Sequence, residues 1–176
     1  MKIYRLVLKK KPKNKKNTSK FLTVSIAVIL VGIVIFYFYS TDQAKIRGFT
    51  FGNEIQSLQQ EIQVEQGKFI SSIAKWEEDS ISDEEMIQMG ELHLEKFNKL
   101  LEKYNELRPP DSFIRSVKLL KLSLEYQIES HEHRLEWIKT GDSSELVRFQ
   151  ELTQLSFEAE QAGLKAFNDA KAGIQQ

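Results

Sequence analysis

Residues 21–39 read FLTVSIAVILVGIVIFYFY and contain no charged side chain. At about 1.5 Å per residue, a helix of this length reaches roughly 28 Å, close to the hydrocarbon thickness of a bilayer. A cleaved signal peptide has a shorter apolar region and a small-residue cleavage site, whereas this run ends in aromatic residues typical of a membrane interface. The sequence therefore predicts a single uncleaved transmembrane signal anchor over residues 21–40.

The charges on the two sides of this run differ in sign. Residues 1–20 hold nine Lys and Arg and no acidic residue, whereas residues 41–176 hold sixteen basic and twenty-five acidic residues, a net charge of −9. The positive-inside rule places the basic tail in the cytoplasm and the remainder outside it, at the cell membrane. An acidic domain argues against nucleic-acid binding. The tail lysines are expected to attract anionic lipid headgroups at the membrane surface. They are Lys9, Lys10, Lys11, Lys13, Lys15 and Lys16.

The composition of residues 41–176 favours an all-α domain. The chain has no cysteine, which excludes disulfides, thiolate metal sites and cysteine nucleophiles. Residues 41–52 form a junction in which Gly48 and Gly52 each weaken a helix by about 1 kcal/mol. Either a continuous helix or a loosened joint fits this segment.

Apolar residues recur at intervals of three and four in four successive segments, beginning near residues 53, 82, 112 and 143. Ser82 begins the second segment with a capping box completed by Glu85, and the prolines at 109 and 110 end it. Asp111 or Ser112 is expected to cap the third segment. Gly141 ends the third segment as a left-handed residue, and residues 142–145 form a second capping box.

Long helices joined by short turns pack antiparallel, so residues 53–176 are predicted to form an up-down four-helix bundle with coiled-coil-like seams. The last helix carries a face of small residues between Ala159 and Ala170. If the other helices cover this face it belongs to the core, and if it is exposed it marks an interface with a protein partner or a second copy of the chain.

Two of the three histidines, His93 and His131, fall on apolar seams at nearly the same distance from the turns at one end of the bundle. Glu65 interrupts the first seam at the same level, and Gln127 or Gln154 can extend a polar layer across the bundle. One interpretation is a hydrogen-bonded pair that fixes helix register. A metal site of His93, His131 and Glu65 is a second, although neither histidine has the Glu-x-x-His spacing of di-iron bundles. A pH-sensing pair is a third.

No catalytic motif is present, so we predict no enzyme and no cofactor. The basic start, the span and the helical bundle resemble, in arrangement only, the extracytoplasmic four-helix sensing modules of bacterial chemoreceptors and histidine kinases. Those modules continue through a second span, which this sequence lacks, so direct transmembrane signalling is not predicted. The first functional hypothesis is a non-enzymatic, membrane-anchored module that binds a protein partner or self-associates. The alternative is a sensor or binder of a metal ion or small ligand through the His93/His131 layer.

Overall fold

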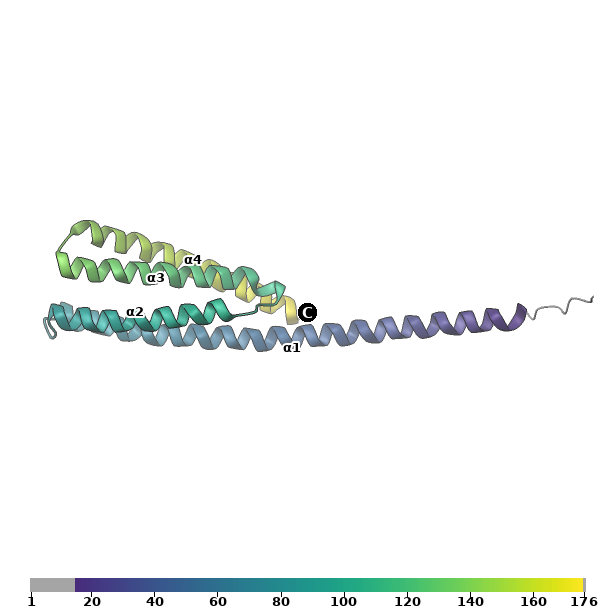
Figure 1. The fold of residues 1–176 in the computed structure, drawn as a ribbon. Helices are drawn as coiled ribbons and strands as arrows, with labels where there is room; N and C mark the ends of the chain where they lie inside the picture. Colours follow the sequence, from purple (N-terminus) through teal and green to yellow (C-terminus); the bar gives the residue numbers. More distant parts are fainter. Residues whose placement is uncertain (1–14, 176) are drawn as a thin grey trace, which may run out of the picture. The chain divides into compact units, whose positions relative to one another are not determined.

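A computed structural model describes the backbone of residues 15–175 and the side chains of residues 31–36, 40 and 42–174. All regular structure within these residues is helical, which confirms the all-α prediction (Figure 1). The chain divides into two compact units, Met1–Ala44 and Lys45–Gln176. The elements are α1 (Lys15–Glu77), α2 (Asp83–Glu106), the short 3-10 helix η1 (Asp111–Phe113), α3 (Ile114–Thr140) and α4 (Ser143–Gln175).

The predicted membrane anchor over residues 21–40 falls largely on side chains outside the described set, as do the six lysines of the basic tail. Among the residues that are described, no helix carries an apolar stretch long enough to cross a membrane.

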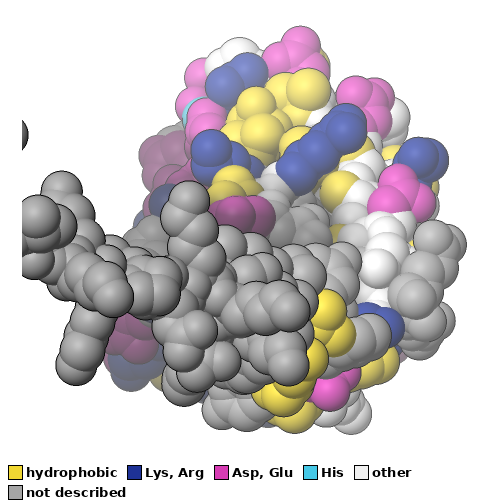
Figure 2. Space-filling view, turned by 90° about the vertical axis from the view of Figure 1, so that its right-hand side faces the viewer, with side chains coloured by type: hydrophobic (Ala, Val, Ile, Leu, Met, Phe, Trp, Pro, Cys, Tyr) yellow, Lys and Arg dark blue, Asp and Glu magenta, His cyan; other side chains and the backbone are white. Residues whose placement is uncertain are grey.

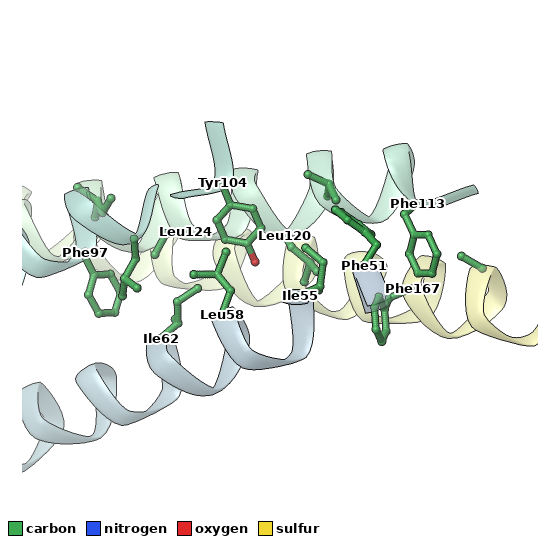
Figure 3. Packing of buried hydrophobic residues seen from close by; sticks show 14 residues of the cluster. Phe51, Ile55, Leu58, Ile62, Phe97, Tyr104, Phe113, Leu120, Leu124 and Phe167 are labelled. Carbon is green, nitrogen blue, oxygen red and sulfur yellow. The ribbon is translucent and has the colours of Figure 1, made fainter. Parts of the chain in front are cut away.

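The second unit is a helical bundle in which the later part of α1 pairs with α2, and α3 pairs with α4 (Figure 1). Its main core cluster draws apolar side chains from all four helices, as Figure 3 shows. Full burial of each such side chain contributes about 1.5–3 kcal/mol relative to exposure. Central members are Ile55, Leu58, Phe97, Tyr104, Leu120, Leu124 and Phe167. Seen from one end, the described surface mixes acidic, basic and apolar side chains without a large patch of one sign (Figure 2).

A second, smaller core cluster is formed by Phe69, Met86 and Leu135. Along α2 and α3, the two clusters are separated by the positions of His93 and His131. The two histidines therefore form a polar level between the two apolar clusters.

Two helix boundaries confirm the sequence predictions. The hydroxyl of Ser82 accepts a hydrogen bond from the backbone N–H of Glu85 at 3.2 Å, and the Glu85 carboxylate accepts one from the Ser82 N–H at 2.9 Å. Gly141 ends α3 with a φ of 71°, a left-handed conformation that a side chain would disfavour.

One other predicted cap is wrong, and another is formed only in part. Neither Asp111 nor Ser112 caps α3, because η1 continues directly into it and Phe113 occupies the cap position without a side-chain hydrogen bond. The second capping box is formed only in part. Asp142 accepts a hydrogen bond from the Ser144 N–H at 2.9 Å, but the Glu145 carboxylate contacts His133 instead.

The junction over residues 41–52 is helical within α1, so of the two alternatives the continuous helix is observed. Gly48 and Gly52 are both buried, and each lies where another part of the bundle comes close. A Cβ atom on Gly48 would collide with Ile174, and one on Gly52 would lie 3.9 Å from Phe167. These glycines permit close packing and do not loosen the helix.

The small-residue face of α4 belongs to the core at three of its positions, whereas Ala162 is exposed and Ala166 is half-buried. Ala159, Gly163 and Ala170 are all buried, and a Cβ atom on Gly163 would lie 2.8 Å from the Leu120 side chain. The absent side chain at this position lets α3 and α4 approach closely.

Candidate functional site

The polar level is built around His93 of α2 and His131 of α3. The prediction that they lie at one height is confirmed, because His93 Nε2 and His131 Nδ1 are 3.0 Å apart. Both side chains are buried, with 5% and 8% of their surface exposed. The His93 ring stacks on Phe69 at a centroid distance of 4.3 Å and also contacts Phe97 at 4.1 Å. Aromatic side chains therefore hold the pair in place.

Burial keeps both imidazoles neutral. It lowers the pKa of His93 to about 4, partly opposed by the Glu65 carboxylate and reinforced by the Lys96 ammonium. Burial also lowers the pKa of His131 to about 3, and the neighbouring His93 and the Arg134 guanidinium lower it further. Near pH 7 the pair carries no charge.

The contact with the Glu65 backbone favours one of the two possible proton arrangements in this pair. A hydrogen bond to the backbone of Glu65 raises the pKa of His93, as expected when the imidazole N–H donates to a carbonyl. Since Nε2 of His93 faces His131, the donor to Glu65 is Nδ1, and Nε2 is an acceptor. In this arrangement His131 donates from Nδ1, and its Nε2 is unprotonated and able to accept one more hydrogen bond.

The predicted metal site of His93, His131 and Glu65 gains no support from this arrangement. The Glu65 carboxylate binds Lys68 at 2.6 Å and Lys96 at 3.3 Å, and the hydrogen bond from Lys68 is the main cause of its lowered pKa. In the part of the chain that the structure describes, no three His, Asp or Glu side chains are placed to hold a metal ion. The two histidines satisfy each other instead.

A cleft of about 360 Å³ opens beside this pair, between α1, α3 and α4. Its size lies at the lower end of the range typical of ligand pockets, roughly 300–1,000 Å³. Helices α1 and α4 contribute the apolar lining residues Phe69, Ile70, Ile73, Phe149 and Phe157. Helix α3 contributes the polar lining residues Gln127, Ser130, His131 and Arg134.

Two buried polar atoms in the wall of the cleft have no hydrogen-bond partner in the protein: Gln127 Oε1 and Arg134 Nε. Gln127 is only 8% exposed. Arg134 is held in position by Glu77, 2.8 Å from one of its terminal nitrogens, and by the face of the Phe149 ring, 5.0 Å away. A buried acceptor without a partner costs about 1–3 kcal/mol, so this wall is incomplete as it stands.

Another groove, of about 620 Å³, lies between α1 and α2. Ion pairs bridge it, because Lys96 reaches Glu65 at 3.3 Å and Lys103 reaches Glu61 at 2.5 Å. Its charged groups are thus already paired, and no buried polar atom of its lining lacks a partner.

Sequence reasoning located the histidine pair and Gln127 but missed the cleft and Arg134. Gln154, the alternative member of the layer, is exposed and donates a hydrogen bond to Glu158. A signal was nevertheless present: residues 127, 130, 131 and 134 are polar at intervals of three and four, which places them on one face of α3. His133, outside this face, pairs with Glu145.

The fold and site thus define an all-helical bundle with a neutral histidine pair beside an amphipathic cleft. No family model, curated protein or solved structure matches this chain in comparisons with known proteins.

Proposed function

We propose that this chain is a non-enzymatic, membrane-anchored module whose helical bundle, outside the cytoplasm, binds a small ligand in the cleft beside His131. The single observation that carries the proposal is the unpaired oxygen of Gln127, buried in the wall of a ligand-sized cleft. Natural proteins seldom leave such an acceptor without a partner, and a ligand in the cleft would supply one.

The membrane anchor in this proposal is supported by the sequence. Residues 21–39 are uncharged over a length that matches a bilayer, and nine basic residues precede them. The compact bundle unit begins at Lys45, directly after the proposed span over residues 21–40.

Binding of a protein partner or self-association has weaker support. The sequence predicted that the small-residue face of α4 would be exposed if it were an interface. Ala159, Gly163 and Ala170 on that face are instead buried by the chain's own helices. Ligand binding is therefore the function that the geometry favours.

Mutations in the cleft test the proposed ligand binding. Thr153 lines the cleft from α4, and Thr153→Trp would fill it, whereas Gln154→Trp adds the same ring to the exposed neighbouring position outside it. The full chain and both variants are purified from their native membranes in lipid nanodiscs, and bound small molecules are identified by native mass spectrometry. We expect a species bound to the wild type and Gln154→Trp but absent from Thr153→Trp. Identical spectra from all three would contradict ligand binding at the cleft.

The membrane topology has a separate test, because a chain without cysteine accepts single reporter thiols. Ser80→Cys places a thiol in the α1–α2 turn of the bundle, and Ser19→Cys places one in the basic tail. A membrane-impermeant maleimide should label Ser80→Cys on intact cells and Ser19→Cys only after lysis. Labelling of the tail but not the bundle on intact cells would reverse the proposed orientation.

A further inference from the structure

We propose that the ligand of the cleft is a neutral aromatic molecule of one or two rings that carries an N–H or O–H donor, and that His131 Nε2 and Gln127 Oε1 recognise this donor. This inference rests on the proposed ligand-binding function and specifies the chemistry of its ligand.

The wall offers two free acceptors and one free donor, Arg134 Nε, so the ligand needs a donor of its own to satisfy the acceptors. Gln127 Oε1 is an acceptor without a partner. In the tautomer that the Glu65 contact favours, His131 donates from Nδ1 to His93 at 3.0 Å, so its remaining nitrogen, Nε2, is a second acceptor. Both residues come from adjoining turns of α3 and line the same cleft. A ligand without a donor would leave Gln127 Oε1 and His131 Nε2 without hydrogen bonds. Such a ligand should bind much more weakly than one that carries the donor.

The charges around the cleft call for a neutral ligand. Among the lining residues Arg134 is positive and Glu160 is negative, so the wall carries no net charge. Outside the lining, Glu77 pairs with Arg134 at 2.8 Å. A carboxylate ligand would meet two acceptors at His131 and Gln127 and would compete with Glu77 for Arg134, although the Nε donor of Arg134 has no partner in the protein. An ammonium ligand would meet Glu160 but also the Arg134 guanidinium. Because the lining holds one charge of each sign, a charged ligand would leave a net charge in the cleft, out of water.

The apolar walls call for a flat ring. Three aromatic rings, those of Phe69, Phe149 and Phe157, line the cleft from α1 and α4. Aromatic side chains favour offset or edge contacts with a second ring. The Arg134 guanidinium lies over one face of Phe149, 5.0 Å from the ring centroid, so a ligand ring can meet Phe149 at its edge or other face. A small aromatic molecule with its donor directed towards α3 is complementary to both sides.

Four probes that differ in one group at a time test this inference. Indole carries the ring and the N–H donor, 1-methylindole lacks the donor, indole-3-acetate adds a negative charge and tryptamine adds a positive one. Each is titrated into the full chain in lipid nanodiscs with ¹⁵N-labelled histidine, and the imidazole nitrogens are followed by NMR. The chain contains three histidines, so His133→Gln, outside the cleft, removes one signal and aids assignment. Empty nanodiscs correct for partition into lipid.

We expect indole to shift the unprotonated Nε2 signal of His131 in a saturable way and to bind about tenfold or more tightly than the other three probes. Gln127→Leu should reduce the preference for indole over 1-methylindole, and Thr153→Trp should abolish binding where Gln154→Trp preserves it. Equal binding of indole and 1-methylindole at the cleft would overturn the inference and leave the proposed function standing. If no probe binds saturably and the imidazole nitrogen signals of His93 and His131 do not shift with any of the four probes, the inference fails. Native ligand identified in the cleft would then still support the proposed function.

Discussion

Acidification should destabilise the bundle through His93 and His131. An unfolded chain protonates its histidines with a pKa of about 6.5, whereas burial in the fold lowers the pKa of His93 to about 4 and that of His131 to about 3. Between these values the unfolded state binds protons that the folded state does not. The stability associated with the neutral pair is therefore fully present above pH 6.5 and is lost as the pH falls towards 4 and 3.

The size of the loss follows from linkage. Each group shifts the free energy of unfolding by about 1.4 kcal/mol per pH unit between its unfolded and folded pKa. At pH 5, which is about 1.5 units below the unfolded value, each of the two histidines costs about 2 kcal/mol, or about 4 kcal/mol together. Since domains are typically stable by about 5–15 kcal/mol, this loss is large enough to measure and to threaten folding.

Urea unfolding of the full chain in lipid nanodiscs at pH 7.5 and pH 5 measures this effect. Trp76 and Trp137 meet edge to face at 5.8 Å in the bundle, so their fluorescence reports its unfolding. The matched reference is the double variant His93→Gln/His131→Gln, in which all other titrating groups remain. We expect the wild type to lose about 4 kcal/mol more than the double variant between the two pH values. Equal losses would refute the argument that the fold holds this pair neutral.

Three substitutions should change stability near neutral pH, measured by the same urea unfolding. Gln127→Leu should raise the free energy of unfolding by about 1–3 kcal/mol, because it removes a buried acceptor without a partner; a loss would mean that this oxygen is already satisfied. Gly163→Ala should lower it by about 1–3 kcal/mol, since the new methyl would lie 2.8 Å from Leu120. Gly67→Ala is its matched control with no atom within 4 Å, and it should raise stability by about 0.5–1 kcal/mol. Ser82→Ala should cost about 1 kcal/mol through the lost cap, and no change would show that the capping box contributes nothing.

Local signals in the sequence were sufficient for much of the fold. The Ser82 cap, the Gly141 stop and the meeting of His93 with His131 each depend on spacing along one helix or on counting residues from a turn. The Asp111 and Ser112 prediction failed because a turn of 3-10 helix joins the preceding proline segment to α3. In that geometry the chain enters the helix without an extended residue to cap it.

The cleft could not be predicted in this way. Periodicity shows which face of a helix is apolar and at what height a polar residue lies, but not how far apart two helices stand. The gap between α1 and α4 depends on which side chains fill it, and at this level Ser130 and Ser156 are small while Gln127 leaves its oxygen unpaired. An orphaned acceptor is a property of three helices together and cannot be read from any one of them.

The polar level is difficult to explain as a stabilising feature. A pair of histidines that fixes helix register would account for His93 and His131, since they satisfy each other. It would not account for Gln127, whose buried oxygen has no partner and whose replacement by leucine should stabilise the fold. A natural sequence keeps a residue that destabilises its own fold mainly where function requires that residue. The unpaired oxygen, set in the wall of an open cleft next to the free acceptor of His131, is therefore better explained by a ligand than by the architecture of the bundle.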